Sequence, residues 1–272
     1  MSLHEHLVDT GRITLNVREA GDGPLAVFMH GITANGAVWD PVLTTLGKSF
    51  RVVSLDQRGH GRSDKPASGY TGADFADDLL AVVETLGGGA PALAVGHSLG
   101  ARNGIVAAAA RPDLISGVVA VDFTPFIEPE VIDTLAARVR GGDRTFGSRQ
   151  SIVDYLSERY PRMPEDAVLR RAMHGYVESD GVYRPLADPN AMAQTADGLR
   201  EDLEPATRDV KRPVLMIRGA DSTLVSETAF ERTRALRPDL EYLVVPGTDH
   251  YVPEEAPDVI SDAVVRFAQG LR

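Results

Sequence analysis

Residues 90–104 read APALAVGHSLGARNG, an apolar run followed by a glycine-flanked serine and an alanine-rich segment. The apolar run has the length of a buried strand and ends at Gly96, and a helical pattern begins at Gly100. The residues between them fit G-x-S-x-G, in which a serine occupies a sharp, strained turn from a strand into a helix. The flanking glycines remove side chains that would collide in such a turn. The spacing therefore predicts that Ser98 projects from the end of a strand as a nucleophile.

The serine pattern alone does not establish a nucleophile, because an ordinary strand–helix turn can also contain a serine. A helix that starts after Ser98 would point its N-terminal amide groups at the oxygen that becomes negative during acyl transfer. A serine hydroxyl also needs a base to take its proton and a carboxylate to orient that base. Residues that can fill these roles occur elsewhere in the chain, and they favour the catalytic interpretation.

The bulk composition narrows the classes of protein. The 272 residues predict one large domain, or one domain with an insertion. A net charge of −11 argues against nucleic acid and anionic membranes as partners. No apolar run is long enough to span a bilayer, no signal segment is evident at the N-terminus, and there is no cysteine to form a disulfide or a thiolate metal site. We expect a cytoplasmic protein that acts on a small molecule, as a monomer or a homodimer.

Strand and helix patterns alternate along most of the chain. We expect strands at residues 3–9, 12–20, 25–29, 51–55, 90–95, 114–121, 212–218 and 240–245, and helices at 34–47, 71–86, 100–110, 226–236 and 257–271. Short loops between alternating strands and helices imply right-handed crossovers and a mostly parallel, twisted sheet flanked by helices. Chemistry in such sheets collects at the carboxyl ends of the strands, and Ile32, Ser98 and Asp122 all follow strand ends.

Residues 126–205 interrupt this alternation. They read as helices separated by polar turns, with no convincing buried strand. We therefore predict a core of residues 1–125 and 206–272, with residues 126–205 inserted as a helical cap over the edge of the sheet.

Two backbone amides are candidates to hold a negative oxygen. The His30-Gly31 pair leaves a buried strand and would place the N–H of Ile32 near the tip of the sheet. The second donor would be the N–H of Leu99, the residue after the nucleophile. We expect the His30 side chain itself to be structural and to bond its own loop.

Seven histidines compete for the role of base. His250 follows the last predicted strand in a glycine-containing loop that can bend back over the sheet, and this order suits a serine placed earlier in the chain. For the orienting acid, Asp122 and Asp221 both follow strand ends. Asp122 leaves its strand directly and is favoured, and Asp221 stays as the alternative.

Together, the GHSLG turn, the His-Gly loop and the terminal Gly-x-Asp-His ending at His250 resemble the α/β-hydrolase superfamily. The resemblance runs along essentially the whole chain. Most members carry the acid after the seventh strand, at the third residue beyond a glycine, and here that position is Ser222. The chain is instead similar to the minority branch whose acid follows the sixth strand, which favours Asp122 over Asp221.

Within that branch the resemblance implies a cap pocket that holds a dicarboxylate. The matching positions are Arg138, Arg159, Tyr160 and Arg171, with Ser222 lining the same pocket. Residues 138–171 hold eight arginines and five acids, although the whole chain is acidic. The planar guanidinium suits bidentate binding of a carboxylate. The ordinary alternative is that these arginines lie on solvated helix faces in surface ion pairs.

These observations predict a serine hydrolase that works through an acyl-enzyme on a small, carboxylate-bearing amide or ester. By resemblance the substrate is an acylated enamide with two carboxylates. A generic carboxylesterase or enol-lactonase would use the same three residues. A ligand receptor on a hydrolase fold and a cofactor-free oxygenase are alternatives of other classes. No metal or organic cofactor is expected, because no cluster of histidines and acids has ligand spacing.

Overall fold

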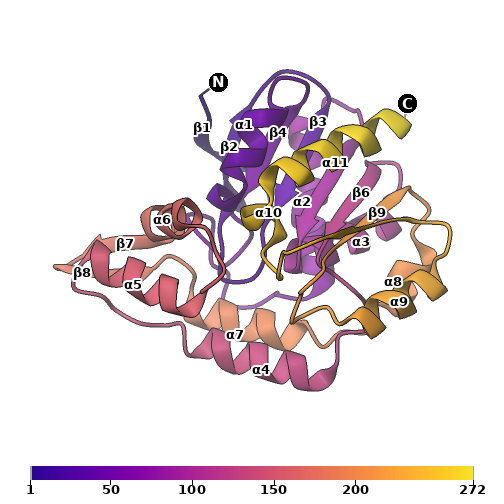
Figure 1. Ribbon diagram of the computed structural model, residues 1–272. Coiled ribbons are helices and arrows are strands. Elements are labelled where there is room, and N and C mark those ends of the chain that lie inside the picture. Colours follow the sequence, from indigo (N-terminus) through magenta and orange to yellow (C-terminus); the bar gives the residue numbers. More distant parts are fainter. Residues whose placement is uncertain (1, 272) are drawn as a thin grey trace.

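The centre of the fold is an eight-stranded sheet with helices on both faces (Figure 1). The computed structural model describes residues 2–271. The strand order is β1-β2-β4-β3-β5-β6-β9-β10, and only the pairs β1–β2 and β2–β4 are antiparallel. The mostly parallel sheet and the α/β-hydrolase fold predicted from the sequence are confirmed. The strand bounds are β1 His4–Asp9, β2 Thr14–Ala20, β3 Leu25–Met29, β4 Arg51–Leu55, β5 Ala92–His97, β6 Ile115–Val121, β9 Val214–Gly219 and β10 Glu241–Val245.

The two faces of the sheet carry separate apolar cores. One core packs under α2, α3, α8 and α9, and the other packs under α1 and α11 around the buried Trp39. All six residues of β5 are buried, as expected of a central parallel strand covered on both faces. The helix bounds are α1 Asp40–Leu46, α2 Gly72–Leu86, α3 Leu99–Ala110, α8 Glu204–Asp209, α9 Glu227–Leu236, α10 Val252–Glu255 and α11 Pro257–Gly270.

The segment predicted as a cap lies at one end of the sheet. It contains the helices α4 (Pro129–Arg140), α5 (Arg149–Arg159), α6 (Glu165–His174) and α7 (Pro189–Gly198). Figure 1 shows α4 and α7 packed side by side below the core, with α5 and α6 to the left.

The same segment also contains a hairpin that the sequence pattern did not predict. Its strands are β7 (Tyr176–Ser179) and β8 (Val182–Pro185), joined by Asp180 and Gly181, which both have positive φ. No residue of either strand is buried, so the hairpin has none of the apolar run that marks a strand of the core.

Backbone strain is concentrated at one edge of the sheet. Among residues 2–271, four residues other than glycine have positive φ, and three of them are Thr33, Ser98 and Asp122. These three follow the carboxyl ends of β3, β5 and β6, which are neighbours in the sheet. Such conformations cost free energy and persist where the surrounding structure holds them, often at functional sites.

Candidate active site

The turn at Ser98 explains why glycines flank the serine. Ser98 has φ 53° and ψ −112°, and helix α3 begins at the next residue. A Cβ atom on Gly96 would lie 2.2 Å from backbone atoms of Gly100, and one on Gly100 would lie 2.3 Å from the carbonyl oxygen of Met29. Because real Cβ atoms do not approach so closely, only glycine lets α3 leave β5 at this angle.

His250 lies in the loop after β10, and its side chain contacts Asp122, which follows β6. The Nδ1–H of His250 donates to Oδ2 of Asp122 at 2.6 Å, which leaves Nε2 with its lone pair free to accept a proton. Oδ1 of Asp122 accepts the Gly219 amide at 2.8 Å, and Oδ2 also accepts the Ser222 hydroxyl at 2.6 Å. Both side chains are buried, and Ser98 and His250 line the same cavity. The geometry suits a base that is oriented by a carboxylate.

Asp221 lies elsewhere. Its Oδ2 accepts a hydrogen bond from Arg162 at 2.7 Å, and about half of its side chain is exposed (48%). The residue sits two positions beyond the end of β9, in a turn where its amide donates to the Thr248 carbonyl. Of the two carboxylates that the sequence left open, the one in contact with His250 is therefore Asp122.

His97 supports the loop that carries His250. The Nε2–H of His97 donates to the backbone carbonyl of His250 at 2.7 Å, and the two rings lie 4.6 Å apart. Burial holds the pKa of His97 well below its usual value, so the ring is neutral and can make this bond near neutral pH.

Two amide groups near Ser98 have no partner. Within residues 2–271 neither the N–H of Ile32 nor that of Leu99 meets a hydrogen-bond acceptor. Ile32 lines a narrow cavity together with Ser98, and Leu99 is the first residue of α3. Unpaired amides beside a nucleophile are suited to stabilising an oxyanion.

Hydrogen bonds of His30 stabilise the loop that carries Ile32. The Nδ1–H of His30 donates to the Gly31 carbonyl at 2.7 Å, and its Nε2 accepts the Gln57 amide at 3.0 Å. The Gln57 side chain donates to the His30 carbonyl at 2.6 Å and accepts from Asn103 on α3 at 2.7 Å. The His30 side chain is thus structural, as expected from the sequence, and through Gln57 it links the loop that carries Ile32 to helix α3.

The neutral His30 makes stability depend on pH. Burial lowers its pKa to about 4, whereas the unfolded chain titrates near pH 6.5. As pH falls through that interval the unfolded state binds a proton that the folded state does not, so stability is lost. From pH 7 to 4.5 we expect His30 to lower the free energy of unfolding by about 2.5 kcal/mol.

Urea denaturation at the two pH values measures this loss. The variant His30→Gln should be less stable at pH 7 but should show a smaller drop on acidification than the wild type. Equal drops in the two proteins would contradict the assignment. His60 is buried against His30, and burial together with His30 lowers its pKa to about 3, so the comparison reports His30 together with its effect on His60.

Three cavities lie near Ser98, and the smallest shares lining residues with each of the other two. The first, here called the arginine chamber, has a volume of about 220 Å³ and lies between the cap and residues 33–35 of the loop after β3. The second, the apolar chamber, has a volume of about 300 Å³ and contains Ser98 and His250 in its wall. The third, the junction, has about 20 Å³ and shares Arg159, Tyr160 and Arg171 with the first, and Ser98 and His250 with the second.

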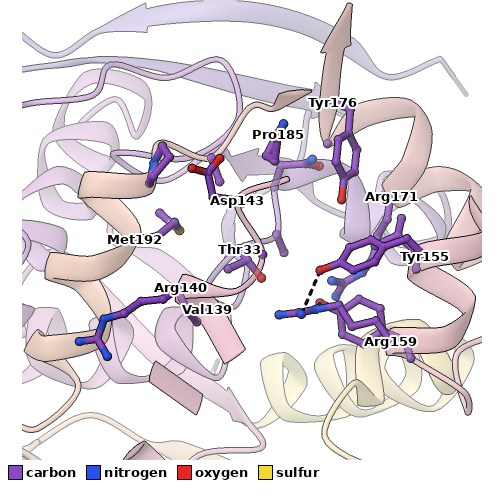
Figure 2. A pocket seen from close by; sticks show the side chains of 18 residues that line it. Thr33, Val139, Arg140, Asp143, Tyr155, Arg159, Arg171, Tyr176, Pro185 and Met192 are labelled. Carbon is purple, nitrogen blue, oxygen red and sulfur yellow. Dashed lines mark hydrogen bonds between the residues drawn. The ribbon is translucent and has the colours of Figure 1, made fainter. Parts of the chain in front are cut away.

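The arginine chamber has one cationic and aromatic wall. Figure 2 shows Tyr155, Tyr176, Arg159 and Arg171 gathered on one side, facing Met192 across the chamber. The dashed line in Figure 2 is the hydrogen bond of 3.0 Å from Nη1 of Arg159 to the Tyr155 hydroxyl.

Three of the predicted cap arginines surround the buried Tyr160. The guanidinium carbons of Arg138, Arg159 and Arg171 lie 4.9, 5.7 and 4.8 Å from the centre of the Tyr160 ring. Burial alone would raise the pKa of Tyr160, but the adjacent cations, Arg171 first, lower it. The structure therefore brings together all four cap residues predicted from the sequence.

The three arginines differ in their partners. Arg171 is buried and forms a bidentate pair with Glu254, with Nε at 2.9 Å from Oε1. Burial opposes its charge, but Glu254 outweighs burial and raises its pKa. Arg138 and Arg159 each donate to the other's backbone carbonyl, at 2.8 and 2.9 Å, and neither pairs with a carboxylate within the part of the chain that the structure describes. They leave positive charge uncompensated beside the junction.

Ser222 is not where the sequence placed it. Its hydroxyl donates to Asp122 at 2.6 Å and accepts the Val225 amide at 3.0 Å, and it lines none of the three cavities. The prediction that Ser222 shares a pocket with the cap arginines is corrected. It lies behind Asp122 because the turn after β9 packs against the end of β6.

Sequence reasoning missed two residues of the site. Tyr251 packs edge-on against Tyr160 at 5.0 Å, and Glu254 carries the charge that balances Arg171. Both belong to the short segment around α10, directly after His250. A four-residue helix has no periodic pattern that a sequence could display, so only its position after His250 could have signalled these roles.

Within residues 2–271 no three histidines or acids come together as a metal site. None of the helices described is both long and apolar enough to cross a membrane.

Comparisons with known proteins agree with this geometry. A family model described as the alpha/beta hydrolase family matches residues 26–263. A 2-(acetamidomethylene)succinate hydrolase of Mesorhizobium japonicum is 54% identical over 96% of this chain and 93% of its own length. The crystal structure of an E-2-(acetamidomethylene)succinate hydrolase superposes with a TM-score of 0.97 at 52% identity, covering 98% of this chain and 100% of the other. The motifs quoted above resemble those of this same enzyme, and the comparisons confirm the resemblance.

A more distant structure shows the fold alone. The thioesterase domain from the curacin biosynthetic pathway has a TM-score of 0.84 at 20% identity, over 97% of this chain and 100% of the other.

Proposed function

This chain belongs to the α/β-hydrolase family, and we propose that it is a serine hydrolase that cleaves the amide bond of a small dicarboxylate such as 2-(acetamidomethylene)succinate. The observation that carries the proposal is the junction. One narrow cavity is lined at once by Ser98 and His250 and by Arg138, Arg159 and Arg171. A substrate held by its carboxylates in the cap would present its acyl carbon to Ser98.

In the proposed mechanism Nε2 of His250 takes the proton of Ser98 while Oγ attacks the acetyl carbonyl carbon. Asp122 holds the Nδ1–H of His250 and stabilises the imidazolium that forms. The amides of Ile32 and Leu99 donate to the negative oxygen, a contribution worth roughly a hundredfold or more in rate for each donor.

Collapse of this intermediate breaks the carbon–nitrogen bond, and His250 gives its proton to the nitrogen. An enamine that carries both carboxylates leaves. Water, deprotonated by His250, then attacks the acetyl ester of Ser98 and releases acetate. By resemblance a second water hydrolyses the enamine to ammonia and an aldehyde, and loss of carbon dioxide from that aldehyde leaves succinic semialdehyde.

The cap arginines would bind the leaving half of this substrate. Two carboxylates match two cations, and Arg138 and Arg159 have no carboxylate partner among the described residues. Arg171 is neutralised by Glu254, but its Nη1 atom has no acceptor in residues 2–271 and it borders the junction. Arginine forks can hold carboxylates in two parallel bonds, which fixes the substrate relative to Ser98.

The proposal predicts that cap arginines matter only for anionic substrates. Replacing Arg138 or Arg159 with glutamine should lower kcat/KM for 2-(acetamidomethylene)succinate by about tenfold to a hundredfold, because a charge-assisted contact is lost. Hydrolysis of a neutral short-chain ester should change by less than about threefold. Initial rates on both substrates measure the difference.

A matched control uses Arg184→Gln, which removes the same charge from an exposed position on β8 that lines none of the three cavities. We expect it to behave as wild type on both substrates. If wild type hydrolyses neutral esters but not the dicarboxylate, the chain is a general esterase or lactonase. If it binds a ligand but turns over neither substrate, it is a receptor.

A further inference from the structure

The apolar chamber is larger than an acetyl group requires. Its volume is about 300 Å³, whereas a methyl group occupies roughly the volume of one water molecule, about 30 Å³. Its interior is formed mainly by apolar side chains: Phe123, Ile127, Val131, Ile132, Leu135 and Leu203. Hydrolysis of an acetamide would leave most of this space without a function.

The two arginines that border this chamber each have a carboxylate partner, and the acid Asp202 borders it as well. Nη2 of Arg102 donates to Glu201 at 2.6 Å and to the Gly198 carbonyl at 2.9 Å. The Nε and Nη1 atoms of Arg102 are buried and have no hydrogen-bond partner among the described residues. Arg200 pairs with Asp133 at 2.6 Å. The chamber therefore offers apolar contact and no free cation for a carboxylate.

The two large chambers suit different parts of a substrate that is bound across the junction. Carboxylates belong on the arginine side, because moving a charged group into an apolar chamber without a partner costs much free energy. The acyl group attached to Ser98 then has the apolar chamber on its other side, since Ser98 and His250 form part of that wall.

From this division we propose that the apolar chamber is an acyl pocket and that the protein hydrolyses N-acyl dicarboxylates with straight acyl chains longer than acetyl. The inference rests on the function proposed above and specifies the acyl group of the substrate. The chemistry is unchanged: the longer acyl chain is transferred to Ser98, and water releases it as the corresponding fatty acid.

The direct test is a series of 2-(acylamidomethylene)succinates with acetyl, propanoyl, butanoyl and hexanoyl groups. Each methylene buried in the chamber should raise kcat/KM by about fourfold until the chamber is full. From acetyl to butanoyl we expect a rise of about fifteenfold. A rise of at least about fivefold supports the proposal, and a smaller rise or a fall overturns it.

Variants locate the effect in the chamber. Val131 and Ile127 are half-buried, line the chamber and lie outside the catalytic residues. Val131→Phe, or Ile127→Phe if the first does not fold, should remove the gain for butanoyl and hexanoyl while acetyl turnover stays within about threefold of wild type. Val131→Ala is the matched control and should keep the gain. If Val131→Phe and Val131→Ala have the same chain-length profile, the acyl chain does not enter this chamber.

A second substrate series separates failure of this inference from failure of the proposed function. In 4-nitrophenyl esters from acetate to hexanoate only the acyl chain varies, and the leaving group carries no carboxylate. If the acetamido dicarboxylate is not cleaved, the proposed function fails. The ester series alone then decides the acyl pocket, by the same criterion of an at least about fivefold rise from acetyl to butanoyl. If the acetamido compound is cleaved but neither series rises, only the acyl pocket is wrong.

Discussion

Replacing Ser98 with alanine is expected to lower kcat by about 10⁶-fold on any substrate that the wild type hydrolyses. Alanine removes the oxygen that attacks the acyl carbon in the first step of the proposed mechanism and leaves the amides of Ile32 and Leu99 in place. The Cβ atom is kept, so the strained backbone at φ 53° is no less favourable than with serine. Single-turnover and steady-state assays of the dicarboxylate measure the loss.

The Ser98→Ala protein should still bind substrate. Calorimetric titration with 2-(acetamidomethylene)succinate should show saturable binding to Ser98→Ala, because the cap arginines are unchanged. Replacing the exposed Ser49 with alanine is the control for serine removal in general and should leave activity unaltered. Full turnover by Ser98→Ala would refute the serine mechanism.

The second large effect concerns the acid. Asp122→Asn is expected to lower kcat by about 10⁴-fold, because an amide group at this position favours the wrong tautomer of His250. Asparagine is close to aspartate in shape and tolerates positive φ, here 49°, so the protein should fold. Its pH–rate profile and kcat, measured beside wild type, report the loss.

Asp221→Asn is the matched control for this experiment. It makes the same chemical change on a carboxylate that pairs with Arg162 at the surface and has no contact with His250. Surface ion pairs contribute at most about 1 kcal/mol to stability, so we expect wild-type activity and a near wild-type Tm. If Asp221→Asn lost activity and Asp122→Asn kept it, the roles of the two acids would be reversed.

Features governed by short stretches of chain were predictable from the residues alone. The turn at Ser98 needs glycine at 96 and 100, because a Cβ atom at either position would collide with nearby backbone atoms. The turn therefore appears in the sequence as a fixed spacing. The alternation of buried strands and helices likewise set the order of the elements and hence the mostly parallel sheet. The hairpin β7–β8 was not predicted, because none of its residues is buried and it therefore lacks the apolar run by which buried strands are identified.

Features that depend on distance through space were decided by the folded structure. The sequence favoured Asp122 over Asp221, and the contacts themselves come from the packing of β6 beside β9. This packing brings Asp122 to His250, whereas Asp221 pairs with Arg162. Arg171 meets Glu254 across 83 positions of chain, whereas Arg138 and Arg159 meet no carboxylate within the residues described. The separation of an arginine chamber from an apolar chamber follows from how the cap lies on the sheet. The sequence by itself indicated Ser98, because the glycines that its turn requires lie within two residues of it. The tertiary structure decided which charges stay unpaired and where, because charge pairing depends on distances that no short spacing fixes.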